Sequence, residues 1–175
     1  MRSGRPAPEL DPDANPAAVA RSIVLAQLTH APKSRHQLEQ KLSERHIPAD
    51  VAQAVLDRFE LVKLVDDAEF AQEWVRTRSL YKSLARGALR RELAEKGIAA
   101  EVAEAALEQV SDDLERAQAQ ELVERKIRPA MDLTDRAERD KYTRRWVAML
   151  ARKGFNPSLA YGIVAEVIDQ QAGSS

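Results

Sequence analysis

The sequence contains no cysteine and few aromatic residues, and both absences limit what the protein can be. Without cysteine it can form no disulfide and no thiolate metal site, and it has no cysteine nucleophile. Aromatic residues make up only 5% of the 175 residues. Ala, Leu, Glu, Arg and Lys are abundant instead, which favours helices over sheets. The composition therefore predicts an all-α protein.

Long apolar segments are also missing. No apolar run approaches the roughly 18 residues that indicate a membrane span, and the N-terminus lacks the apolar segment of about 7–15 residues typical of a signal peptide. We therefore expect a soluble cytoplasmic protein that does not bind membranes. Residues 1–16 contain four prolines among small and charged residues, with no apolar periodicity. This segment is predicted to be a disordered N-terminal arm.

Motifs for catalysis or cofactor binding are absent as well. No glycine-rich segment resembles a P-loop or a dinucleotide-binding fingerprint. His30, His36 and His46 lie near one another in the sequence, but His36 and His46 are ten positions apart, which is not the i+3 or i+4 spacing of helical metal ligands. We therefore expect no enzymatic activity, no cofactor and no metal site.

One six-residue segment occurs three times. Residues 93–98 read Leu-Ala-Glu-Lys-Gly-Ile; 51 positions earlier, residues 42–47 read Leu-Ser-Glu-Arg-His-Ile, and 57 positions later, residues 150–155 read Leu-Ala-Arg-Lys-Gly-Phe. Each copy has the pattern of a Schellman cap, in which a residue in the left-handed conformation ends the helix and the next apolar residue packs back onto the leucine. Glycine suits that position because it has no Cβ, and His46 is a tolerated exception.

Apolar residues on both sides of the caps follow the same repeat. We therefore predict an elongated, curved array of three tandem three-helix repeats, because each repeat buries only one face alone and needs its neighbour to complete the core. The predicted boundaries are 17–65, 66–110 and 111–171. The repeated apolar positions are Leu38, Leu89 and Trp146 before the cap, then Val51, Val102 and Leu159, and then Val55, Ala106 and Ile163.

Local signals place the helices. Ser34 and Gln37 form the pattern of a capping box, and Pro48 suits the first turn of the following helix, which we expect to carry Val62 on its apolar face. The second repeat should begin at residue 66 with a buried stripe that includes Trp74. The predicted helices run over about residues 17–30, from Ser34 to the His46 cap, from Pro48 through Val62, and over about residues 85–96, 99–110, 134–153 and 157–171. The first helix of the second repeat begins at residue 66, and the third repeat begins near residue 111.

The net charge of −1 conceals blocks of opposite sign. Residues 76–96 contain seven basic and two acidic residues, residues 99–124 contain eight acidic residues and one arginine, and residues 125–153 contain ten basic and four acidic residues. Such alternation predicts a surface that contacts a partner of mixed charge, or two partners.

Two groups of basic residues are candidates for binding an anionic partner. In the first group, four residues have no acidic residue three or four positions away, whereas the neighbouring pairs Arg91–Glu95 and Glu92–Lys96 can simply decorate a solvated helix. In the second group, Asp140 can pair with one arginine. The first group is Arg76, Arg78, Lys82, Arg86 and Arg90, and the second is Arg144, Arg145, Arg152 and Lys153.

Residues 65–71 read Val-Asp-Asp-Ala-Glu-Phe-Ala, and residues 87–98 read Gly-Ala-Leu-Arg-Arg-Glu-Leu-Ala-Glu-Lys-Gly-Ile. Together they resemble the central repeat of the RecX family, whose members regulate the RecA recombinase, and residues 150–155 resemble that family's third repeat. The resemblance covers about residues 17–170, and the first repeat departs from it with His46 in place of glycine. It implies three tandem three-helix repeats and a non-enzymatic protein, which we expect to be a monomer. Its partners would be RecA and the RecA–DNA filament, whose groove it would occupy.

The resemblance also implies a negative regulator that inhibits the recombinase, ATPase and coprotease activities of RecA. From the charge of the basic helices we expect protein contacts to supply most of the specificity and weak, salt-sensitive contacts to DNA phosphates to add affinity. The two basic groups above are the candidate RecA- or DNA-binding residues. An alternative is a direct DNA-binding protein that inserts one helix into the major groove. The nearly neutral net charge and the lack of a dimerisation segment argue against it. Trp74 and Trp146 occupy apolar repeat positions, so we expect them in the core and not stacked on bases.

Overall fold

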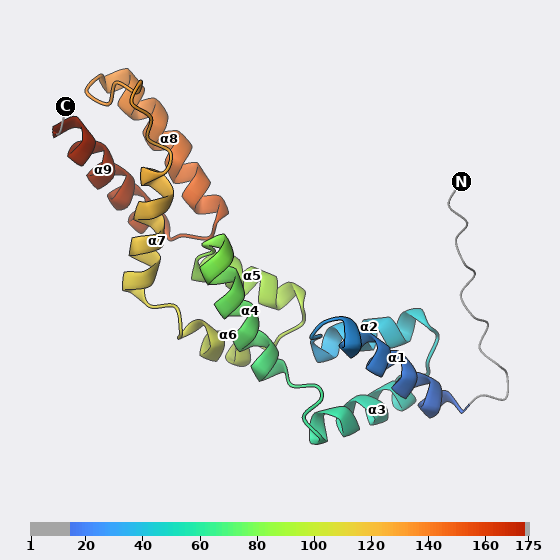
Figure 1. Ribbon diagram of the computed structural model, residues 1–175. Helices are drawn as coiled ribbons and strands as arrows, with labels where there is room; N and C mark the ends of the chain where they lie inside the picture. The colour runs from blue at the N-terminus through green and yellow to red at the C-terminus, as the bar shows by residue number, and fades with distance from the viewer. Residues whose placement is uncertain (1–14, 174–175) are drawn as a thin grey trace, which may run out of the picture. The chain divides into compact units, whose positions relative to one another are not determined.

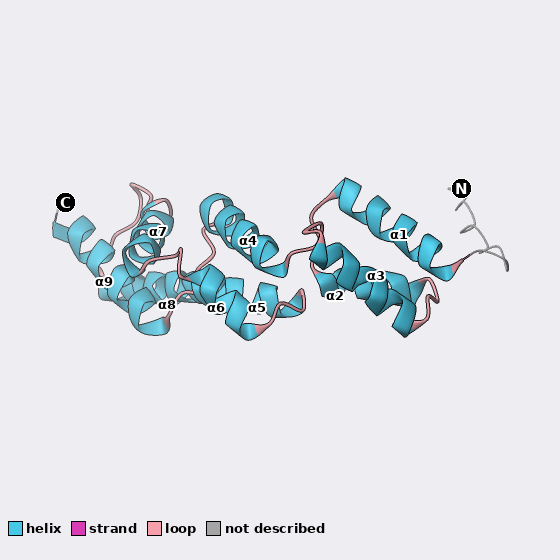
Figure 2. Cartoon of the chain, turned by 90° about the horizontal axis from the view of Figure 1, so that it is seen from below, coloured by secondary structure: helices cyan, strands magenta, loops and turns pink. Residues whose placement is uncertain are grey.

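The computed structural model describes residues 15–173, and these residues form nine helices and no strand (Figures 1 and 2). The all-α class predicted from composition is confirmed. The chain divides at residue 67 into two compact units. Unit 1 contains α1 (Pro16–His30), α2 (Arg35–Glu44) and α3 (Ala49–Leu61). Unit 2 begins at Ala68, the second residue of α4. It contains α4 (Asp67–Lys82), α5 (Arg86–Glu95), α6 (Ala100–Leu107), α7 (Asp112–Glu124), α8 (Arg136–Arg152) and α9 (Pro157–Gly173).

The three predicted Schellman caps are present. His46, Gly97 and Gly154 have φ values of 58°, 72° and 88°. In each cap the apolar residue that follows donates its N–H to the carbonyl of the repeated leucine, at 3.1 Å from residue 47, 3.0 Å from residue 98 and 3.1 Å from residue 155. All three leucines are completely buried. The motif therefore ends one helix of each repeat and ties the turn beyond it to the core.

Unit 1 has its own core between α1, α2 and α3. The predicted capping box is present, since the Ser34 hydroxyl accepts the N–H of Gln37 and the Gln37 amide accepts the N–H of Ser34. Asn15 caps α1 through the N–H of Ala17. The predicted arm of residues 1–16 therefore does not include its last two residues, because Asn15 caps α1 and Pro16 begins it. The prediction for residues 1–14 lies outside the described residues. The prediction for Val62 was wrong: α3 ends at residue 61, and Val62 is 56% exposed.

A second contact recurs at the repeat distance of 51 residues. Arg35 and Arg86 are the first residues of α2 and α5, and each donates its backbone N–H to a carboxylate, Asp67 at 2.8 Å and Glu115 at 2.7 Å. A helix N-terminus has unpaired N–H groups and positive potential, so it favours an acidic acceptor. Asp67, the first residue of α4, thus also accepts a hydrogen bond from the start of α2.

Unit 2 has two cores, one among α4, α5 and α6 and the other among α7, α8 and α9. They meet where the α8–α9 corner packs against the start of α5. The N–H of Ala85 donates to the carbonyl of Lys153 at 2.9 Å, and Ala85 itself is buried within the second core. Gly87 and Gly154 lie so close that a Cβ on Gly87 would be 2.5 Å from the Gly154 carbonyl oxygen. The predicted repeats 2 and 3 therefore share a tightly packed contact within one unit.

Repeat 3 differs from the other two in its long middle helix. α8 has 17 residues, whereas α2 and α5 have 10 each. It begins at Arg136, two residues later than predicted, because Asp135 caps it by accepting the N–H of Glu138. Trp146 is buried as predicted. No described helix is both long enough and apolar enough to cross a membrane.

Candidate partner-binding surface

Arg86 and Arg90, which have no acidic neighbour within their own helix, are paired with acids from other helices. The Arg86 guanidinium contacts Glu115 at 3.0 Å and also Asp112. Arg90 contacts Glu104 at 2.5 Å. The hydrogen bonds that both guanidinium groups donate to these carboxylates raise the pKa of the two arginines, and the bond from Arg90 lowers the pKa of Glu104. The expectation that the two arginines are unpaired was wrong, because α6 and α7 supply carboxylates that sequence spacing does not reveal.

Arg76 and Arg78 are also engaged within unit 2. Arg76 contacts Glu73 one turn earlier at 2.5 Å. The Arg78 guanidinium lies 4.3 Å from the centre of the Trp74 ring and its Nε is 3.6 Å from Glu92. The Trp74 indole N–H donates to Glu92 at 2.8 Å, and its ring is half-buried rather than fully enclosed. These contacts fix Arg78 on its own unit, which makes it a poor candidate for binding a partner.

The remaining predicted cations have no carboxylate partner within the described residues. Two of them, one from each predicted group, lie next to each other, because the Lys153 ammonium donates to the carbonyl of Lys82 at 2.7 Å. The structure thus places Lys82 of the first predicted group beside Lys153 of the second, although the two residues lie about seventy positions apart in the sequence. These cations are Lys82, Arg144, Arg145, Arg152 and Lys153.

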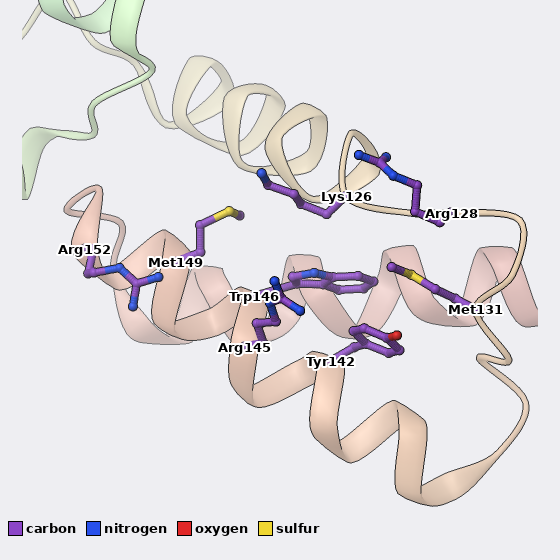
Figure 3. A pocket seen from close by; sticks show the side chains of 8 residues that line it. All are labelled: Lys126, Arg128, Met131, Tyr142, Arg145, Trp146, Met149 and Arg152. Carbon is purple, nitrogen blue, oxygen red and sulfur yellow. The ribbon is translucent and has the colours of Figure 1, made fainter.

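A pocket of about 360 Å³ opens between the end of α7 and the exposed side of α8 (Figure 3). We call it the α7–α8 pocket. Two of its basic residues, Arg145 and Arg152, were predicted, whereas Arg144 on the same helix does not line it. Its lining residues are Lys126, Arg128, Met131, Tyr142, Arg145, Trp146, Met149 and Arg152.

Lys126 and Arg128 were not singled out in the sequence, although both fall in its third, basic block. They follow the end of α7, and the turn there brings them opposite α8. The Arg128 guanidinium donates to the carbonyls of Arg125 at 2.9 Å and Ile127 at 3.1 Å, so it is held by backbone and keeps its charge uncompensated. The four cations of the pocket have no carboxylate partner within residues 15–173. The arrangement favours binding of anionic groups.

The aromatic rings in the pocket are packed against each other. Tyr142 stacks on Trp146, with ring centres 5.2 Å apart and an angle of 25° between the planes. The Lys141 ammonium lies 5.1 Å from the centre of the Tyr142 ring, and the Glu138 carboxylate, 3.0 Å away, raises the pKa of Lys141. Trp146 is only 2% exposed. The rings therefore form part of the floor of the pocket and are not free to stack on other rings.

Within residues 15–173 no group of three or more His, Asp or Glu residues is arranged to hold a metal ion. The α7–α8 pocket instead places charged side chains around an apolar floor.

Comparison with known proteins identifies two segments of the chain. Residues 20–59 match the family profile described as the first three-helix domain of RecX, and residues 66–107 match the profile of its second three-helix domain. The regulatory protein RecX of Streptomyces coelicolor is 40% identical over 161 residues, which cover 92% of this chain and 84% of that protein. The RecX of Thermobifida fusca is 42% identical over 158 residues, 88% of this chain and 81% of that protein.

Solved structures show the same fold. The crystal structure of RecX from Lactobacillus salivarius matches with a TM-score of 0.72 at 22% identity and covers 91% of this chain and 98% of that one. A second crystal structure, of a regulatory protein RecX, matches with a TM-score of 0.75 at 24% identity and covers 90% of this chain and 80% of that one.

Proposed function

Because this chain belongs to the RecX family of regulatory proteins, we propose that it is a negative regulator of RecA. It binds the RecA–DNA filament along its groove and inhibits recombinase, ATPase and coprotease activity. It acts in the cytoplasm as a monomer, by binding and not by catalysis. The observation that carries the proposal beyond family membership is the α7–α8 pocket, where four cations without carboxylate partners surround an apolar floor.

The cations predicted from the sequence divide into those that pair with carboxylates of the described residues and those that do not. Arg86 and Arg90 stabilise the contacts of α5 with α6 and α7, so we assign them a structural role. Lys82, Arg145 and Arg152 are exposed and without carboxylate partners in the described part of the chain. We propose that these residues, together with Lys126 and Arg128 of the α7–α8 pocket, contact acidic groups of RecA. DNA phosphates add a weaker, salt-dependent attraction.

Several weak contacts along a filament can together give tight binding, because each contact after the first is effectively intramolecular. A chain with several three-helix repeats can make more than one such contact, and each repeat has a helix ended by the same cap. This supports binding to successive RecA protomers in preference to a single isolated one.

The test is the rate of RecA ATP hydrolysis on single-stranded DNA, measured with and without the protein. Inhibition is expected at protein concentrations that barely bind naked duplex DNA. The double variant Arg145→Glu, Arg152→Glu should inhibit less at low salt, and the difference should shrink as the Debye length falls from about 30 Å at 0.01 M to about 8 Å at 0.15 M salt. Arg136→Glu, an exposed change on α8 outside the pocket, is the matched control.

An unchanged ATPase rate at saturating protein would refute the proposal. Equal and sequence-specific binding to bare duplex DNA would instead favour the alternative, a DNA-binding protein with a helix in the major groove. Charge reversal at Arg86 is unsuitable for this test, because a glutamate there would face Glu115 and Asp112 and damage the fold.

A further inference from the structure

The floor of the α7–α8 pocket is apolar and adaptable. Met131 and Met149 are half-buried and stand on two sides of the buried Trp146 ring (Figure 3). Methionine side chains are flexible and polarizable, so they can pack around apolar groups of different shapes. A cavity of about 360 Å³ lies at the lower end of the roughly 300–1,000 Å³ range of ligand pockets. This floor suits one large apolar side chain.

The rings of the floor are poorly placed to stack a nucleotide base. Trp146 covers one face of the Tyr142 ring, and the Lys141 ammonium lies over the Tyr142 ring as well. Trp146 itself is almost completely buried. Recognition of single-stranded nucleic acid depends on aromatic faces that are free to stack with bases. The pocket therefore favours a protein segment over a nucleic acid.

The rim of the pocket is cationic on both sides. Lys126 and Arg128 lie in the turn that follows α7, and Arg145 and Arg152 lie on α8 two turns apart. All four are exposed, and none has a carboxylate partner within the described residues. Carboxylates on each side of a central apolar residue would reach both pairs, and arginine can hold such groups through paired hydrogen bonds.

We propose that the α7–α8 pocket binds an acidic segment of a protein partner through one large apolar side chain flanked by carboxylates. The apolar side chain enters between Met131 and Met149, and the carboxylates pair with the cations of the rim. This inference rests on the proposed function, since it specifies the chemistry of one contact that a RecA-binding protein makes.

The probe is a fluorescein-labelled, capped peptide of sequence Gly-Asp-Glu-Leu-Asp-Glu-Gly, titrated with the full chain and followed by fluorescence anisotropy. The same peptide with alanine in place of leucine should bind about tenfold more weakly, because most of the apolar surface that the pocket buries is then lost. An oligothymidylate of the same net charge serves as the nucleic-acid competitor.

Variants separate the two parts of the pocket. Met131→Ala and Met149→Ala should reduce the preference for leucine over alanine while leaving charge-dependent binding in place. Arg145→Glu should weaken both peptides by a similar factor. Arg136→Glu is the matched control on α8 and should change neither affinity. Circular dichroism identifies any variant that has lost helix, and Met131 precedes α8, so its substitution does not interrupt a helix.

Equal affinity for the leucine and alanine peptides would overturn the proposal, and so would tighter binding of the oligothymidylate with displacement of the peptide. The absence of peptide binding at low salt would also overturn it. The assay contains no RecA, so its outcome is independent of the ATPase test: peptide binding without inhibition of RecA refutes the proposed function, and inhibition without peptide binding refutes the pocket.

Discussion

The contact between Gly87 and Gly154 provides a quantitative test of how the last two predicted repeats are joined. Gly87 is the second residue of α5, and a Cβ there would lie 2.5 Å from the Gly154 carbonyl oxygen. Gly162 in α9 is also helical, but a Cβ there would have no atom within 4 Å. Replacing a helical glycine by alanine normally stabilises by roughly 0.5–1 kcal/mol, whereas forced overpacking costs about 1–3 kcal/mol.

Gly87→Ala and Gly162→Ala should therefore change the free energy of unfolding in opposite directions. Gly162→Ala should raise it by about 0.5–1 kcal/mol, through helix propensity alone. Gly87→Ala should lower it, because the clash is with backbone, which cannot turn aside as a flexible side chain can. After the propensity gain is subtracted, the net loss is about 0.5–2 kcal/mol.

Gly154→Ala and Gly97→Ala form a second matched pair. Both glycines have positive φ, at 88° and 72°, so each alanine costs about 1–2 kcal/mol of backbone strain. At Gly154 the new Cβ would also lie 2.1 Å from the backbone nitrogen of Ala88, which adds roughly 1–3 kcal/mol. Gly97 is exposed, so Gly97→Ala measures the strain that both positions share.

The assay is urea unfolding followed by tryptophan fluorescence. Both tryptophans, Trp74 and Trp146, belong to unit 2, so the signal reports the unit that contains all four glycines. Stabilisation by Gly87→Ala to the same extent as Gly162→Ala would refute the close approach, as would equal losses for Gly154→Ala and Gly97→Ala.

Three further predictions follow from contacts in unit 2. Glu115 is buried and accepts both the N–H and the guanidinium of Arg86, so Glu115→Ala should cost about 1–3 kcal/mol in urea unfolding, and Glu115→Gln should cost less because it keeps one acceptor. Arg90 lowers the pKa of Glu104, so the pair contributes stability above the ordinary glutamate pKa and loses it as the pH falls; the destabilisation by Arg90→Ala should thus shrink between pH 7 and pH 3, and a pH-independent difference would contradict this. Leu93 is completely buried, so Leu93→Ala should destabilise by about 2–5 kcal/mol and reduce RecA inhibition only in proportion to the unfolded fraction.

The helix ends were predictable because their chemistry is local. The hydroxyl of Ser34 and the amide of Gln37 are three residues apart, and a capping box needs no other part of the chain. The same holds for the caps at His46, Gly97 and Gly154, where the left-handed residue and the apolar residue after it are adjacent in sequence. The predicted end of α3 was wrong at Val62, because the apolar periodicity of the sequence continues one residue beyond the last helical residue.

The charged residues were harder to interpret, because their partners come from other helices. Arg86 has no acid within one turn, and Glu115 is 29 positions away. Lys126 and Arg128 could be counted as basic residues but not assigned to the same pocket as Arg145 and Arg152. The boundaries predicted at 17–65, 66–110 and 111–171 are still predictions, although the two family profiles fall within the first two.

The amino-acid sequence by itself determined the helical class, the three repeated caps and the family, since each of these depends on composition or on residues a few positions apart. Only the tertiary structure decided which cations are free, because long-range packing sets which carboxylates they meet. It neutralised Arg86 and Arg90 with acids from α6 and α7, and it brought the end of α7 opposite α8 to form a cationic pocket over an apolar floor.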